Sequence, residues 1–153
     1  MKKAWMSTAA AALMLVSMGG AKAAYAGGKA EQVVIKYDDA VKNYEDKKGR
    51  KIDGSVKFYW ADEKAPVQGG EELSARGMTM QRGEQEERCV KALAAALITF
   101  QERAKSEGKN AVVGIHTYYD ASTKSGDRNH CLCIGGNFNT RTTVKGRLAK
   151  ISK

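Results

Sequence analysis

Residues 84–107, EQEERCVKALAAALITFQERAKSE, carry the clearest periodic pattern in the chain and decide its fold. Apolar side chains recur in this stretch at spacings of three and four residues: Cys89, Leu93, Ala96, Leu97, Phe100 and Ala104. Acidic residues open the stretch and Gly108 follows it, which are typical signals for the start and the end of a helix. The pattern therefore predicts one long amphipathic helix whose apolar side, including Cys89, faces a core.

Short stretches on both sides of this helix have the composition or the two-residue alternation of strands. We expect a helical turn at 38–41 and strands at residues 32–36, 54–60, 110–119, 130–139 and 142–151. Residues 61–83 contain the only proline and several glycines, which predicts a mobile loop. The fold class expected from this order is α+β, with one long amphipathic helix packed on a small antiparallel sheet.

The first 26 residues have the features of a secretory signal peptide. Two lysines precede an apolar run at 9–18, and small residues allow cleavage after Ala23 or after Ala26. The apolar run is too short to cross a bilayer, so we expect no stable membrane insertion. The sequence predicts a periplasmic protein whose mature chain, residues 27–153, has the length of a single domain.

Composition argues against several classes of function. The chain has a formal net charge of +9, but no aromatic side chain stands among the basic residues near its C-terminus, which argues against nucleic-acid binding. It has only two histidines, His116 and His130, and no serine or cysteine with a patterned base. Gly108 and Lys109 lack the first glycine and the hydroxyl of a phosphate-binding loop. We therefore expect a non-catalytic protein without a cofactor.

Three cysteines, Cys89, Cys131 and Cys133, raise the main question about the site. Cysteines of exported domains tend to pair because their compartment is oxidising. Cys131 and Cys133 are two residues apart on a predicted strand, a separation too large for a good bond between them. Either of them can instead reach Cys89, which predicts a disulfide from helix to sheet and leaves one thiol over.

A metal site is the alternative role for this segment. His130, Cys131 and Cys133 would then bind a soft metal ion such as zinc or copper. That arrangement requires the disulfide to be absent, and neighbouring His130 and Cys131 point to opposite faces of a strand. A heavy-metal-binding or redox-responsive periplasmic protein is the second functional hypothesis.

Several segments resemble a family of small exported bacterial proteins that are commonly labelled as excinuclease ATPase subunits. The resemblance lies in Cys89 and in residues 54–59, 92–101, 110–113 and 118–119. An exported chain without a phosphate-binding loop cannot be that ATPase subunit, so the label does not carry over. The usual second cysteine of the family matches Cys131, so the resemblance implies a Cys89–Cys131 disulfide with Cys133 as the free thiol.

More distantly, the helix cysteine and residues 110–112 and 133–135 are similar to the signalling domain of the RcsF lipoproteins, which sense envelope stress. This resemblance implies a small α+β domain in which disulfides tie the helix to the sheet. The chain lacks the lipidated cysteine, and His116 stands roughly where those proteins have another cysteine. We expect a non-catalytic binding or envelope-sensing module that contacts an envelope protein and is a monomer or a weak dimer.

Overall fold

The computed structural model describes residues 30–42, 44–80 and 82–152, so the predicted signal peptide lies outside the described residues. The described residues form two helices and seven strands, in the order β1 Glu31–Ile35, α1 Tyr37–Lys42, β2 Lys57–Trp60, β3 Glu72–Thr79, α2 Gln85–Ser106, β4 Ala111–Tyr118, β5 Lys124–Ser125, β6 Cys131–Gly135 and β7 Thr140–Ala149. The mixed α+β class and the single domain are confirmed. The long helix predicted at 84–107 is α2.

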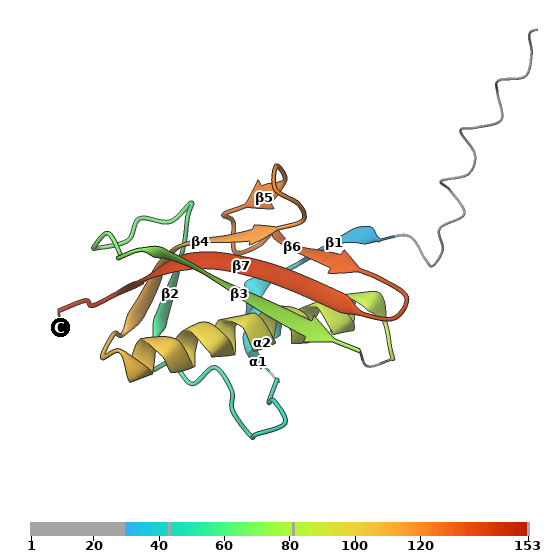
Figure 1. Cartoon of the computed structure of the whole chain (residues 1–153), viewed down its shortest axis with the longest axis horizontal. Coiled ribbons are helices and arrows are strands. Elements are labelled where there is room, and N and C mark those ends of the chain that lie inside the picture. Colours follow the sequence, from blue (N-terminus) through green and yellow to red (C-terminus); the bar gives the residue numbers. More distant parts are fainter. Residues whose placement is uncertain (1–29, 43, 81, 153) are drawn as a thin grey trace, which may run out of the picture.

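The seven strands form one curled sheet in which the last strand, β7, is central (Figure 1). Along one edge of β7 the partner is β3, which pairs antiparallel with it from Glu72 to Thr79. Along the other edge, β7 pairs with β6 near its start and with β4 farther on. The sheet therefore branches at β7, since β6 leads to β1 and β4 leads to β2 and β5.

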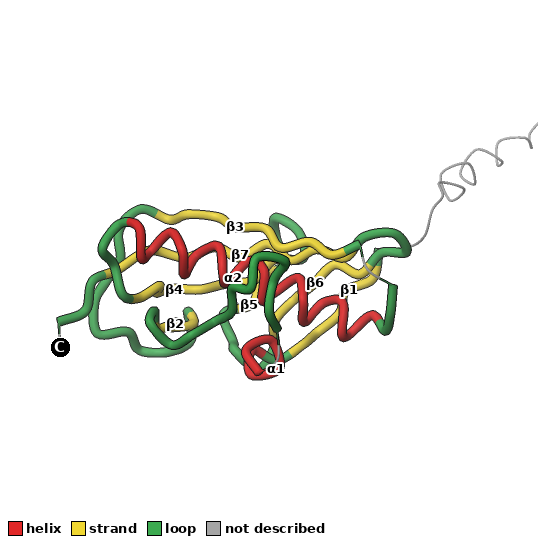
Figure 2. Tube along the Cα trace, turned by 90° about the horizontal axis from the view of Figure 1, so that it is seen from below, coloured by secondary structure: helices red, strands yellow, loops and turns green. Residues whose placement is uncertain are grey.

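The expected small antiparallel sheet under a single long helix was wrong in two respects. The sheet is mixed, because β2 pairs parallel with β4. A parallel pair needs a crossover connection, and here β3 and α2 lie in the chain between β2 and β4. The sheet is also larger than expected, and two helices, α1 and α2, lie on the same side of it (Figure 2).

The predicted mobile loop at 61–83 was wrong for the eight residues of β3. This strand crosses α2 so closely that a Cβ atom on Gly77 would lie 1.7 Å from the carbonyl oxygen of Ala92. The two inward positions of β3 nearest the crossing hold small residues for this reason, Ala75 and Gly77, and both are buried. Small inward side chains remove the apolar alternation by which a strand is recognised in a sequence.

A bulge in β4 decides which of its side chains face the core. The pairing of β4 with β7 shifts between Val113 and His116, and Gly114 has a φ of +66°. A glycine in the left-handed region is typical of such a bulge. Because of the shift, Val112 and Ile115 both join the main core, while His116 and Tyr118 are only partly buried.

Candidate functional site

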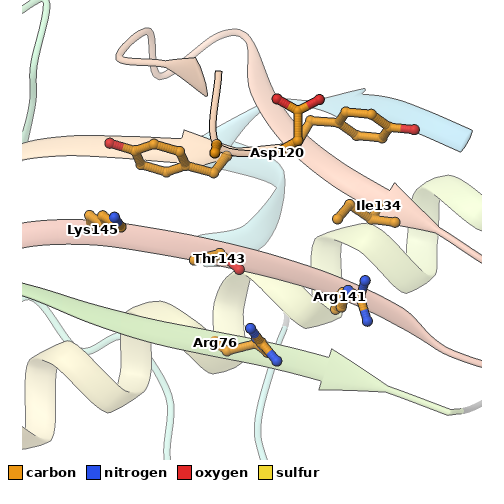
Figure 3. A pocket seen from close by; sticks show the side chains of 9 residues that line it. Arg76, Asp120, Ile134, Arg141, Thr143 and Lys145 are labelled. Atoms are coloured by element: carbon orange, nitrogen blue, oxygen red, sulfur yellow. The ribbon is translucent and has the colours of Figure 1, made fainter. Parts of the chain in front are cut away.

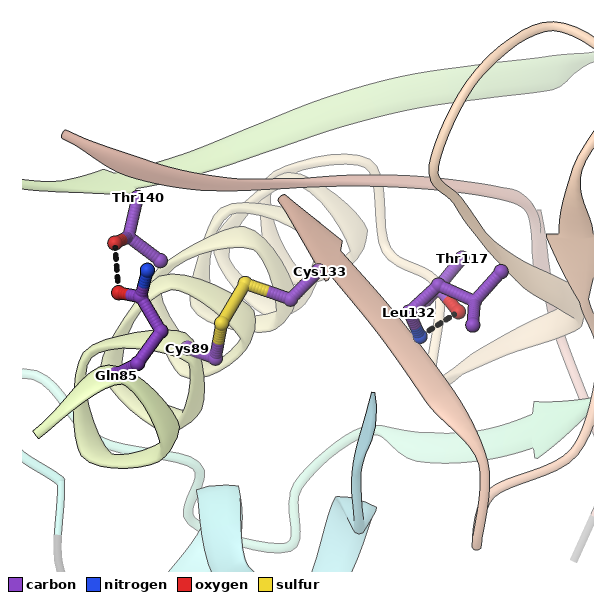
Figure 4. Close-up of a disulfide and its surroundings, with 6 residues drawn as sticks. All are labelled: Gln85, Cys89, Thr117, Leu132, Cys133 and Thr140. Carbon is purple, nitrogen blue, oxygen red and sulfur yellow. Dashed lines mark hydrogen bonds between the residues drawn. A yellow bond between two sulfur atoms is a disulfide. The ribbon is translucent and has the colours of Figure 1, made fainter. Parts of the chain in front are cut away.

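The disulfide joins Cys89 of α2 to Cys133 of β6, and the buried free thiol is Cys131 (Figure 4). The Cα atoms of the bonded pair are 5.9 Å apart, which is an ordinary separation for a disulfide. The expectation of a Cys89–Cys131 bond with Cys133 free was therefore wrong. The expectation of a bond between helix and sheet was right.

The register between α2 and β6 explains why Cys133 is the partner. The first residue of α2, Gln85, accepts a hydrogen bond from the hydroxyl of Thr140, and a Cβ atom on Gly135 would lie 2.3 Å from the Gln85 amide (Figure 4). One turn of helix from Gln85 to Cys89 advances about 6 Å. Two residues of strand from Gly135 back to Cys133 span nearly the same distance, about 6.6 Å. Cys89 therefore lies over Cys133, and Cys131 is one further step away.

Cys131 is held as a neutral thiol. Its Sγ donates to the carbonyl oxygen of Arg128 at 3.3 Å, and its side chain has no exposed surface. Burial, together with the negative charge of Asp127, raises the pKa of the Cys131 thiol to about 12. A thiol with so high a pKa is a weak nucleophile and a weak metal ligand at neutral pH, because both roles need the thiolate.

The proposed metal ligands are not brought together in this state of the protein. Cys133 is bonded to Cys89, so its sulfur is not a free thiolate, while His130 is exposed and Cys131 is buried. Within the described ranges, no group of three or more His, Cys, Asp or Glu side chains is placed to hold a metal ion. The Nδ1 atom of the other histidine, His116, is 3.1 Å from the carbonyl oxygen of Gly114.

An open groove of about 370 Å³ lies on the face of the sheet that points away from the helices (Figure 3). It forms where the sheet branches, between the end of β4 and the paired strands β6, β7 and β3. Its walls come from these four strands and the turn after β4: Arg76, Tyr118, Tyr119, Asp120, Ala121, Ile134, Arg141, Thr143 and Lys145. We call it the branch groove.

The branch groove carries an excess of positive charge. Arg76, Arg141 and Lys145 line it, and none of the three has an ion pair with another described residue. The Lys145 ammonium lies 4.9 Å from the centre of the Tyr118 ring. The one acidic lining residue, Asp120, accepts hydrogen bonds within its own turn from Ser122 and Thr123, which lower its pKa.

No motif in the sequence marks the residues of this groove as a site. The alternation of Arg141, Thr143 and Lys145 in the final strand was a signal for one exposed, basic sheet face. No such alternation surrounds Arg76, because its neighbours at the inward positions of the strand are the small residues Ala75 and Gly77. The joining of the two strands into one basic surface depends on the pairing of Arg76 with Thr143, which only the folded sheet shows.

A second surface lies at the end of β3, and we call it the methionine edge. Met78 and Met80 are exposed to 48% and 73% and line a hollow of about 630 Å³ together with Tyr44. Phe138 is exposed to 77% and lies at the same end of the sheet. It precedes Thr140 by two residues, and Thr140 pairs with Thr79 at the end of β3. Among the described strands β3 pairs only with β7, so its other backbone edge is not part of the sheet.

Comparison of the chain with protein-family models, with curated proteins and with solved structures finds no match. Neither described helix combines the length and the apolar character that a membrane crossing requires.

Proposed function

We propose that this protein is a non-catalytic binding or sensing module of the bacterial envelope. It is exported through a cleaved signal peptide, works in the periplasm, and acts through contact with an envelope protein. The observation that carries the proposal is the methionine edge, where Met78 and Met80 are exposed at the end of the outer strand β3.

Exposed large apolar side chains that gather in one place are typical of interaction sites. Five such side chains are exposed among the described residues, and three of them, Met78, Met80 and Phe138, belong to one end of the sheet. Methionine is flexible and polarisable, so it adapts well to a partner's surface. The end of β3 therefore suits a protein whose apolar side chains contact Met78 and Met80, while its polar groups meet the charged residues Glu45, Lys47 and Lys91 that also line the hollow.

The outer edge of β3, with which no other described strand pairs, supports a protein partner over a small molecule. An exposed strand edge presents unpaired N–H and C=O groups, which an extended segment of another protein can bond. Residues 72–78 of β3 are long enough for such pairing. The expected partner thus contributes an extended segment with apolar side chains that cover Met78 and Met80.

The disulfide supports the export of the chain. A bond between Cys89 and Cys133 persists in oxidising compartments and is rare in the cytosol. The remaining thiol, Cys131, has the raised pKa of an unreactive buried cysteine, which fits a binding module better than a redox catalyst.

Site-specific photocrosslinking in the periplasm tests this proposal. A photoreactive residue at position 80 should give one discrete crosslinked protein, while the same residue at position 67 should not, because Val67 is exposed on a different segment. The crosslinked protein, once purified, should bind the double variant Met78→Ser, Met80→Ser about tenfold more weakly than wild type and should bind Val67→Ser normally.

Two results would contradict the proposal. If the crosslinked partner is a second copy of this chain, the edge is a dimer interface and not a site for an envelope protein. If the double variant binds the purified partner as tightly as wild type does, the methionine edge is not the contact surface.

A further inference from the structure

The branch groove places three basic side chains around one hydroxyl group, a feature that the proposed protein contact does not explain. Thr143 of β7 pairs with Arg76 of β3 on one side and with Tyr118 of β4 on the other. Arg141 and Lys145 lie two residues away from Thr143 in either direction, about 6.6 Å along the strand. Figure 3 shows Arg76, Arg141 and Lys145 arranged about Thr143 in this way.

The positive charges in the groove repel one another and have no acidic partner in the described part of the chain. Of the lining residues only Asp120 is acidic, and its Oδ1 atom accepts three hydrogen bonds from Ser122 and Thr123. Another carboxylate, Glu72, acts on Tyr118, whose pKa is raised first by burial and then by that charge. A bound anion would relieve the repulsion and gain from the field of all three cations.

The arrangement favours a phosphate group over a carboxylate. A carboxylate has two oxygen atoms in one plane and is satisfied by one arginine fork. A phosphate is tetrahedral, carries up to two negative charges and has three or four oxygen atoms that point in different directions. Arg76, Arg141 and Lys145 come from two strands and lie on three sides of Thr143 in the sheet, which matches the phosphate (Figure 3).

The remaining walls of the groove suit a carrier molecule. Tyr118, Tyr119 and Ile134 are partly buried and offer apolar surface beside the cations. A volume of about 370 Å³ lies at the lower end of the range for small-ligand sites. There is room for a phosphate and for one ring-sized group next to it.

We propose that the branch groove binds a phosphate group, either free or carried on a small hydrophilic molecule such as a sugar. Arg76 and Arg141 donate hydrogen bonds to its oxygen atoms, Lys145 contributes charge, and the Thr143 hydroxyl donates from the floor of the groove. The tyrosine rings contact the carrier where there is one. Such a site would give the sensing module a ligand to sense.

Isothermal titration calorimetry on the mature, disulfide-bonded protein tests the proposal with four probes: inorganic phosphate, glucose 6-phosphate, glucuronate and glucose. Both phosphate probes should bind, and their affinity should fall as salt is added, because the contacts are ionic. Equal affinity for the two phosphates indicates a site for free phosphate, and tighter binding of glucose 6-phosphate indicates a carried one. No binding of either phosphate, or equal binding of glucuronate, overturns the proposal.

Matched variants locate the binding. Arg76→Gln and Arg141→Gln should each weaken the binding of the phosphate probe about tenfold or more, since each removes charge-assisted hydrogen bonds. Lys109→Gln is the control, because Lys109 is exposed and lies before β4, at the opposite end from the groove. A loss in Lys109→Gln equal to that in Arg76→Gln would overturn the site, and melting curves show whether each variant is folded.

The methionine edge and the branch groove can be tested independently of each other. The Met78→Ser, Met80→Ser variant changes the edge of β3 and none of the cations in the groove, so it should bind the phosphate probes as wild type does. Loss of phosphate binding in this variant would contradict the assignment of the two functions to separate surfaces.

Discussion

Cys131 stays protonated because it is buried next to the carbonyl oxygen of Arg128 and near the charge of Asp127. Its pKa in the folded protein is about 12, against an ordinary value of 9.0. Between these values only the unfolded chain releases the proton. The stabilisation from keeping this thiol neutral is therefore complete below pH 9 and is lost as the pH rises toward 12.

We predict that the free energy of unfolding falls more between about pH 8 and pH 10.5 in wild type than in Cys131→Ala, which lacks the thiol. Urea unfolding at the two pH values measures both falls. Tyr44 and Tyr118, whose pKa values burial raises, act in both proteins and cancel in the comparison. The pKa of Tyr37 is raised mainly by burial but also by the charge of Cys131, so that part of its effect belongs to the thiol. Equal falls in the two proteins would show that the Cys131 thiol titrates normally.

The hydroxyl group of Thr117 links the two branches of the sheet directly. The backbone N–H of Leu132 in β6 donates to the Thr117 hydroxyl of β4 at 2.8 Å, and both residues are buried (Figure 4). The bond lies where β4 and β6 separate, and these two strands do not pair with each other through their backbones. Its donor would otherwise be buried without a partner, at a cost of about 1–3 kcal/mol. The bond therefore ties β4 directly to β6, in addition to the pairing of both strands with β7.

The contact between β3 and α2 depends on the absence of side chains where the two elements cross. A Cβ atom on Gly77 would lie 1.7 Å from the oxygen of Ala92 and 2.9 Å from the nitrogen of Ala96. Both atoms belong to the backbone of α2, so neither can move aside as a side chain would. The helix and the strand can approach this closely only with glycine at position 77.

We predict that Gly77→Ala lowers the free energy of unfolding by about 3 kcal/mol, because β3 must move away from α2. Gly70→Ala is the control, since the added Cβ atom would lie 3.9 Å from its nearest neighbour, in ordinary contact. That variant should change stability by less than about 0.5 kcal/mol. Urea unfolding of both variants measures the difference, and a Gly77→Ala protein as stable as wild type would contradict the close crossing.

The same crossing explains why the strand was missed in the sequence. The signal for a half-buried strand is large apolar side chains at alternate positions. In β3 those positions hold Leu73, Ala75 and Gly77, and the smallest of them lies where the helix is closest. The element that makes the tightest contact with α2 is thus the one with the weakest pattern.

The Cys89–Cys133 disulfide ties the long helix to the sheet across a separation of 44 residues. Closing a loop of this length removes enough entropy from the unfolded chain to stabilise the fold by about 4 kcal/mol. That is a large share of the total for a domain of this size. The bond therefore supports the whole arrangement of α2 on β6 and β7, including the strands that form the branch groove.

We predict that Cys89→Ala and Cys133→Ala each lower the melting temperature strongly, by similar amounts, and that reducing agent has little further effect on either variant. Cys131→Ala should lower the melting temperature less and should remain sensitive to reducing agent. Thermal melts of the three variants with and without dithiothreitol measure this. If Cys131→Ala instead behaves like Cys89→Ala, the bond runs to Cys131, as the family resemblance implies.

Local patterns in the chain were enough to place α2, the strands β4, β6 and β7, and the mixed α+β class, because the side of an element that faces the core appears as a period in its own residues. They were also enough to predict a disulfide between helix and sheet. The partner of Cys89, the parallel pairing of β2 with β4, the branch at β7 and the groove above it were decided by the tertiary structure. Each depends on the register or direction of segments far apart in the chain, and such relations leave no periodic signal within any one segment.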